Sequence, residues 1–182
     1  IKYSGEDFTS KIARVREWMR ENNTTTHILT SLDDIAWLFN IRGGDIKYNP
    51  VVLSYAVITL DKAILFVDEN KLNDEIKTSF GEEVVEIKNY FEIYEFVKTI
   101  NKEEIVLIDS NKISYSILKN IPAGVKVVNG MNPSTKFKAQ KNSVEIENTK
   151  KAHIRDGVAV TKFMYWLKNN IGKIEITELS AA

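Results

Sequence analysis

Apolar runs of strand length alternate with amphipathic helical patterns along most of this 182-residue chain, and that alternation constrains the fold more than any other feature. Helices are predicted at residues 6–22, 35–39, 69–79, 89–100 and 114–120, and strands at 27–30, 53–60, 63–67, 83–87, 105–108 and 125–128. Such alternation is typical of layered α/β domains. Because a tight turn at Asp61-Lys62 joins two of the strands, we expect a mixed β-sheet flanked by helices.

Two Ser-x-x-Asp patterns predict helix starts, one at Ser4 to Asp7 and one at Ser31 to Asp34. Asp33 and Asp34 could also chelate a hard cation. We favour the capping role, because the pattern already explains both carboxylates.

Composition excludes several classes of function. Twenty-five basic residues balance twenty-five acidic ones, so no net charge favours nucleic acid or an anionic membrane. The absence of cysteine excludes disulfides, thiolate zinc sites and a cysteine nucleophile within this sequence. No apolar run has the length of a membrane span, and a cytoplasmic location is the default expectation. The first residue is Ile1 and not Met, so the true N-terminus stays open.

Neither histidine lies in a metal-binding motif, and we predict no catalytic or metal-ligating residue in the chain. His27 stands at a strand start and is interpreted as structural. The sequence His153-Ile154-Arg155-Asp156 lacks a nucleophile or a second carboxylate nearby. We therefore interpret it as a buried polar contact between a helix and the sheet.

The segment at residues 40–50, Asn-Ile-Arg-Gly-Gly-Asp-Ile-Lys-Tyr-Asn-Pro, is predicted to be a loop presented by a rigid scaffold. Two adjacent glycines allow positive φ there, and a proline fixes the exit. Arg42, Asp45 and Tyr48 are its candidate binding residues. In the alternative interpretation, an Arg42–Asp45 pair merely fastens the turn, and the chemistry alone leaves both open.

The last part of the chain predicts a second domain. Residues 130–141 look like a loop, which places a boundary near 135–142 and divides the chain into domains at 1–140 and 141–182. Residues 142–169 contain no proline and predict a long helix that is apolar on more than one side. We expect other structure to cover this helix, and therefore a truncated piece of a longer protein. The alternative is a natural C-terminal helix that docks back on the first domain.

Several blocks, in order, carry a resemblance to a known family. They are TSLDDIAWLFNIRGGD at residues 30–45, YNPV at 48–51, SYAVI at 54–58, AHIRDGVA at 152–159 and ELSAA at 178–182. Together they resemble the middle domain and the start of the catalytic domain of large, three-domain Xaa-Pro aminopeptidases. The resemblance implies a creatinase N-terminal-domain-like fold at 1–140, followed by the first helix of a truncated pita-bread domain.

The same resemblance implies a function for the parent protein. It would be a metallo-aminopeptidase that removes the N-terminal residue from peptides with proline in second position, using two Mn²⁺ ions. The family's ligands, two Asp, one His and two Glu, would fall after residue 182, so this piece alone is expected to be inactive. The partners implied are proline-containing peptides, and a homodimer is allowed. Arg42, Asp45 and Tyr48 would then help to shape a substrate entrance, with Arg42 pairing with a carboxylate.

Two other functions stay open on the sequence. One is a non-enzymatic interaction module like the histone-chaperone subunit that shares the pita-bread fold, since a fold does not imply activity. The other is a stand-alone scaffold domain.

Overall fold

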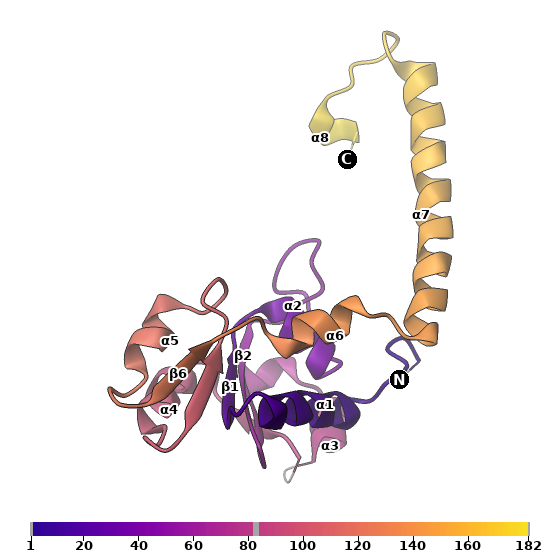
Figure 1. Cartoon of the computed structure of the whole chain (residues 1–182). Helices are drawn as coiled ribbons and strands as arrows, with labels where there is room; N and C mark the ends of the chain where they lie inside the picture. Colours follow the sequence, from indigo (N-terminus) through magenta and orange to yellow (C-terminus); the bar gives the residue numbers. More distant parts are fainter. Residues whose placement is uncertain (1, 82–83, 182) are drawn as a thin grey trace. The chain divides into compact units, whose positions relative to one another are not determined.

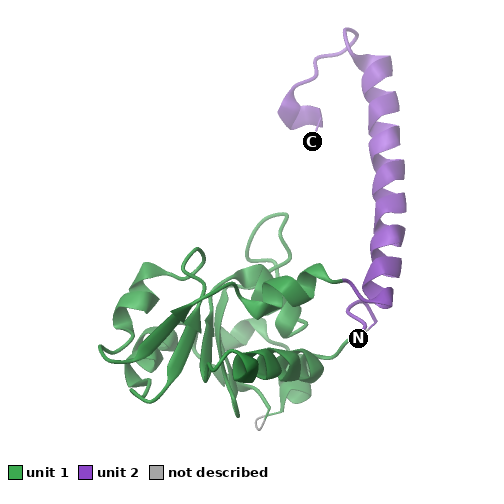
Figure 2. Ribbon diagram, viewed as in Figure 1, with its two compact units in different colours: residues 1, 6–140 green, residues 2–5, 141–182 purple. Residues whose placement is uncertain are grey.

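The computed structural model of the chain describes residues 2–81 and 84–181, which form two compact units (Figure 2). The first unit comprises residues 6–140. The second comprises residues 2–5 and 141–182. The short N-terminal segment and the C-terminal segment therefore belong together, although nearly the whole sequence separates them.

A six-stranded mixed sheet forms the centre of the first unit (Figure 1). Its strands are β1 (Thr26–Leu29), β2 (Ser54–Thr59), β3 (Ala63–Val67), β4 (Glu86–Lys88), β5 (Ile105–Ile108) and β6 (Lys126–Asn129). Their spatial order is β4-β3-β2-β1-β5-β6. The β2–β3 pair is antiparallel, and the Thr59 N–H closes its turn by donating to the Lys62 carbonyl at 2.9 Å. Strand β2 also pairs antiparallel with β1, whereas β1–β5, β5–β6 and β3–β4 are parallel, so the predicted mixed sheet is confirmed.

Helices flank both faces of the sheet. They are α1 (Phe8–Glu21), α2 (Leu32–Leu38), α3 (Asp74–Phe80), α4 (Ile93–Phe96), α5 (Tyr115–Asn120) and α6 (Pro133–Ala139), with 3₁₀ turns η1 (Glu69–Lys71), η2 (Tyr90–Glu92) and η3 (Val97–Thr99). One core joins the sheet to α1, α2, α3 and α6 through side chains such as Val15, Ile35 and Phe80. A second core on the other face joins it to α4 and α5 through Ile93 and Ile117. The alternation of side chains along each strand separates these two cores.

Several local predictions differ from the structure. The α1 cap is Asp7, whose side chain accepts a hydrogen bond from the Ser10 N–H, so Ser4 does not cap this helix. The predicted single helices at 69–79 and 89–100 are broken into short 3₁₀ and α segments. The supposed loop at 130–141 contains α6, with proline in its first turn, where a missing N–H costs nothing. Of the predicted strand at 83–87, residue 83 lies outside the described residues, and β4 occupies Glu86–Lys88.

The second unit is built on α7 (Ser143–Asn170), followed by the short α8 (Glu178–Ala181). Asn142 and Glu145 form a reciprocal capping box at the start of α7. The Asn142 amide also donates to the Ser4 carbonyl at 2.7 Å, which attaches the N-terminal segment to this helix. Within α7, all of which is described, no residue is buried. None of the helices in the described residues is both long and apolar enough to cross a membrane.

Candidate functional site

The loop that follows α2 carries the three candidate binding residues, and the structure gives Arg42 a definite role within it. One guanidinium nitrogen, Nη1, donates to the carbonyl oxygens of Ala36 and Ile41, both at 2.8 Å. The Ala36 carbonyl lies in the last turn of α2 (Leu32–Leu38), where helical partners run out, and the Ile41 carbonyl lies in the segment that follows the helix. Arg42 therefore caps this helix, and among the described residues it forms no ion pair with Asp45.

Asp45 fastens the other side of the loop. One of its carboxylate oxygens, Oδ2, accepts the Leu53 N–H at 2.7 Å and lies 2.8 Å from the Lys71 ammonium. The hydrogen bond from Lys71, followed by that from the Leu53 N–H, lowers the pKa of Asp45. The carboxylate is thus ionised near neutral pH and ties the loop to the residue before β2 and to η1.

Tyr48 is the residue that the loop presents. Its side chain is 92% exposed, and its φ of 64° lies in the left-handed region that non-glycine residues seldom adopt. A β-bridge between Ile46 and Asn49 spans the tip of the loop. The Lys47 ammonium lies 4.9 Å from the centre of the Tyr48 ring. Strained, exposed and rigidly supported residues of this kind are typical of functional sites.

A buried lysine that the sequence analysis missed supports the start of this loop. Lys11 of α1 is only 1% exposed, and its ammonium donates to the Trp37 carbonyl at 2.9 Å and to Asn40 Oδ1 at 2.6 Å. It also lies 4.4 Å from the centre of the Trp37 ring, within the range of a cation–π contact. Asn40 itself has a φ of 56°. The signal was available, because Lys11 falls on the same stripe as Phe8 and Val15.

Asp34 is an ion-pair hub and does not form the predicted capping box. The Ser31 side chain makes no capping bond to the backbone, and its hydroxyl donates to Asp34 Oδ2 at 2.6 Å. The ammonium groups of Lys112 and Lys138 lie 2.9 Å from Asp34 Oδ2 and Oδ1, respectively. Burial alone would raise the pKa of Asp34, but the hydrogen bonds outweigh it and hold this pKa below its ordinary value. Asp33 is exposed and pairs with Lys138.

The two histidines occupy opposite environments. His27 is fully buried in the sheet, with Nδ1 3.2 Å from the Leu107 carbonyl oxygen, in agreement with a structural role. His153, in contrast, is exposed on α7, as are Arg155 and Asp156, so the expected burial of these polar side chains is wrong.

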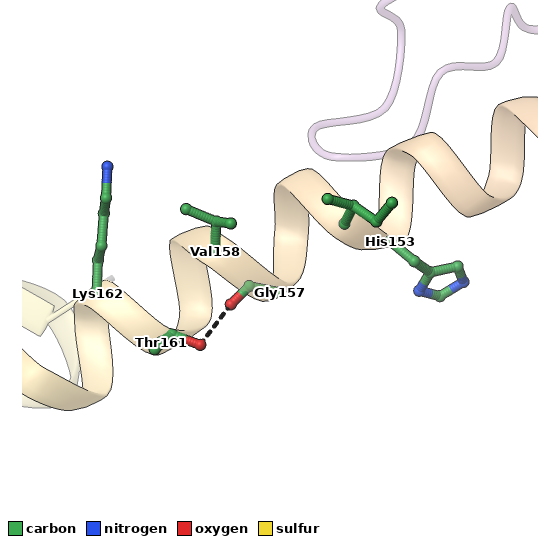
Figure 3. A pocket seen from close by; sticks show the side chains of 6 residues that line it. His153, Gly157, Val158, Thr161 and Lys162 are labelled. Carbon is green, nitrogen blue, oxygen red and sulfur yellow. Dashed lines mark hydrogen bonds between the residues drawn. The ribbon is translucent and has the colours of Figure 1, made fainter.

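A shallow pocket lies along α7 where Gly157 leaves a gap between larger side chains (Figure 3). His153, Ile154, Gly157, Val158, Thr161 and Lys162 line it. The Thr161 hydroxyl donates back to the Gly157 carbonyl at 2.7 Å and points along the helix. The site consists of one helix face and brings together no second element.

Within the described residues, no group of three or more His, Asp or Glu side chains is arranged to hold a metal ion. The carboxylates of Asp34 and Asp45 are engaged by lysines, which compete with a cation for the same oxygens. The two-metal chemistry implied by the resemblance therefore does not fit the residues that the structure describes.

Comparison with known proteins covers almost the whole chain. The profile of the creatinase/prolidase N-terminal domain family matches residues 1–145. A protein from Talaromyces stipitatus named probable Xaa-Pro aminopeptidase P is 38% identical over 94% of the chain, and one of the same name from Coprinopsis cinerea is 36% identical over 100%. The chain spans only 27% and 31% of the length of these two proteins.

Solved structures show the same likeness. The X-prolyl aminopeptidase of Caenorhabditis elegans, described as a cytosolic enzyme with a di-nuclear active site, superimposes with a TM-score of 0.90 at 27% identity. The match covers 100% of this chain and 30% of that one. A Xaa-Pro dipeptidase from Bacillus anthracis shares the fold, with a TM-score of 0.70 at 15% identity.

Proposed function

Because the chain belongs to the creatinase/prolidase N-terminal domain family, we propose that it is a non-catalytic part of a Xaa-Pro aminopeptidase. The observation that carries the proposal is the likeness to the C. elegans X-prolyl aminopeptidase, which extends over the whole chain and includes α7. The two fungal relatives agree with it in name and in coverage.

We assign residues 1–140 to the middle domain of the parent protein and residues 141–182 to the start of its catalytic domain. The parent would act in the cytoplasm on peptides with proline in second position. The peptide bond before proline is a tertiary amide without an N–H, so its hydrolysis needs a dedicated site. The metal ligands of that site, and the two Mn²⁺ ions that we expect there, would belong to other parts of the parent.

We further propose that the loop of residues 42–50 shapes the substrate entrance of the parent, with unequal roles for its three candidates. Arg42 and Asp45 hold the loop, because their charged groups bond to its backbone and to neighbouring elements. Tyr48 is the contact residue, because its ring is exposed and the surrounding backbone is fixed. A preformed loop of this kind binds without a large cost in conformational entropy.

The activity is tested on the full-length parent. We expect it to cleave a peptide with proline in second position, and not a matched peptide with alanine there. A chelator should abolish the cleavage, and Mn²⁺ should restore it. The 182-residue chain alone should show no turnover that survives further purification. A folded, metal-supplemented parent without activity would contradict the proposal and favour a non-enzymatic module.

The loop is tested by comparing Arg42→Ala with Tyr48→Ala in the same parent. We expect Tyr48→Ala to lower kcat/KM about 10-fold while leaving stability unchanged, since a lost contact of about 1.4 kcal/mol corresponds to a factor of ten. Arg42→Ala should also lower stability, because it removes a helix cap. An unchanged kcat/KM in both folded variants would leave the loop with a structural role only.

A further inference from the structure

Four aromatic side chains meet where β2 lies beside η2 and α4, and we call them the aromatic cluster. Tyr55 comes from β2, Tyr90 and Phe91 come from η2, and Tyr94 comes from α4. The rings of Tyr55 and Tyr90 are stacked, with their centroids 4.9 Å apart. The Tyr94 ring is T-shaped to Tyr55 at 6.2 Å, and the Phe91 ring is T-shaped to Tyr90 at 5.2 Å. These distances place all four rings side by side.

The three tyrosine hydroxyls of the cluster are hydrogen-bonded to one another. The Tyr90 hydroxyl donates to that of Tyr55 at 3.2 Å, and the hydroxyl oxygens of Tyr55 and Tyr94 lie 3.3 Å apart. Burial, followed by these two hydrogen bonds, raises the pKa of Tyr55, so this phenol keeps its proton at neutral pH. Three O–H protons serve two hydrogen bonds, so one O–H is left to donate to an acceptor outside the cluster.

The cluster is firmly held and yet open to solvent. Tyr55 and Tyr94 pack against the core that α4 and α5 cover, and both are only partly buried. Phe91 is 71% exposed, although phenylalanine is usually buried. The turn that carries Phe91 is fixed, because Asn89 and Glu92 form a reciprocal capping box at η2. A ligand that covers such preformed rings pays little conformational entropy.

The chemistry of the cluster fits a neutral ligand with apolar groups and hydrogen-bond acceptors. No lysine or arginine among the described residues forms a cation–π contact with any of the four rings. The rings themselves offer apolar faces, and the remaining O–H offers a donor. A proline-containing peptide in the polyproline II conformation has the complementary groups, because its side-chain rings are apolar and its backbone carbonyls lack internal partners. Aromatic surfaces recognise such peptides repeatedly, since their backbone is already ordered before binding.

We propose that the aromatic cluster is a binding surface for extended, proline-containing peptides. The aromatic rings contact the proline rings, and the remaining O–H donates to a carbonyl of the peptide backbone. Phe91 is the most exposed contact residue. The inference goes beyond the proposed function, because it concerns binding by this chain and holds whether or not the parent cleaves peptides.

The first test is an NMR titration of the 182-residue chain with a blocked polyproline peptide. We expect saturable shift changes at the ring signals of the aromatic cluster, whereas the ring of Tyr115, which is 77% exposed on α5, should be unaffected. A blocked peptide of the same length, with alanine and serine in place of proline, should bind about 10-fold more weakly or less. Equal affinity for the two peptides would refute the proposal and indicate a surface for folded proteins in general. The absence of saturable changes at the cluster would also refute it.

The second test compares Phe91→Ser with Tyr115→Ser, a matched control at another exposed aromatic residue. Phe91→Ser should keep the fold, because the side chain it removes is exposed, and should weaken polyproline binding about 10-fold. Tyr115→Ser should leave the affinity unchanged. An unchanged affinity in folded Phe91→Ser, or an equal loss in both variants, would overturn the assignment of the site. Cleavage by the parent is a separate measurement, so a failure of this proposal is distinguishable from a failure of the proposed function.

Discussion

The stability of the chain is expected to fall as the pH drops from 7 to 4, because His27 must be neutral in the folded state. Burial lowers the pKa of His27 from 6.5 to about 4, against smaller opposing effects from the Leu107 carbonyl and from the carboxylates of Asp34 and Asp109. The unfolded chain therefore binds more protons than the folded chain between these two values. The contribution of neutral His27 to the free energy of unfolding is fully present above the unfolded-state pKa. It declines as the pH falls towards the folded-state pKa.

The magnitude follows from the size of the shift. Each pKa unit corresponds to about 1.4 kcal/mol, so a shift from 6.5 to about 4 predicts a loss of about 3 kcal/mol. This is a large fraction of the stability of a typical domain, which lies at about 5–15 kcal/mol. The loss should be nearly complete near pH 4, where ordinary carboxylates also become protonated, so the comparison with a His27 variant is needed to isolate it.

The perturbation is His27→Gln, compared with wild type by urea unfolding at several pH values between 4 and 7.5. The difference in unfolding free energy between the two proteins should change by about 3 kcal/mol across this range. His153→Gln is the control, since that histidine is exposed on α7 and its loss should leave the pH profile unchanged. Parallel curves for wild type and His27→Gln would refute the reasoning, because His27 would then titrate alike in both states.

Two further substitutions test the polar interior, and a third tests the start of α7. Asp34→Asn should destabilise the chain by about 3 kcal/mol at pH 7, measured by urea unfolding, because it leaves two lysines beside a neutral group. The stabilisation by the Asp34 carboxylate should be fully present above the unfolded-state pKa of about 4. It should be lost as the pH falls further, through the lowered folded-state pKa. Lys11→Met should cost about 2 kcal/mol in the same assay, whereas Lys77→Met at an exposed site should cost less than about 0.5. Gly5→Ala should speed amide exchange in the first turn of α7, because the new Cβ would lie 2.6 Å from Asn142 Oδ1 and the φ of Gly5 is +66°. Gly44→Ala is the control and should leave this exchange unchanged, because no atom lies within 4 Å of a Cβ at Gly44.

The regular elements were predictable because their signals are local. The run Ile105 to Ile108 is apolar throughout and forms β5 within its predicted bounds. The hairpin at residues 53–67 also formed as expected, since both strands are apolar and a tight turn separates them. The sequence did not predict helix α6, because its residues, Pro-Ser-Thr-Lys-Phe-Lys-Ala, have little apolar periodicity. Its formation depends on tertiary contacts such as those of the buried residues Asn132 and Ser134.

The charged interior was less predictable, because pairing depends on distant parts of the chain. Asp34 looks like a helix cap in the sequence, and the lysines that engage it are 78 and 104 residues further along. Lys11 looks like a solvated helical residue, although its partners are at Trp37 and Asn40. The position of Lys11 on the stripe of Phe8 and Val15 indicates burial, but no local pattern identifies the distant partners of Lys11 or Asp34.

The candidate loop shows why charge is a poor guide to the residue that meets a ligand. Arg42 and Asp45 have the most recognisable chemistry, yet both side chains bond to backbone groups, and the Asp45 carboxylate also pairs with Lys71. Holding Tyr48 at a positive φ requires firm support on both sides, and these two residues supply it. A substitution at either anchor should therefore change stability and kcat/KM together, whereas a substitution at Tyr48 should change kcat/KM alone. If stability and kcat/KM fall together in the Arg42 and Asp45 variants, these residues support the loop. If kcat/KM alone falls in the Tyr48 variant, Tyr48 contacts the substrate.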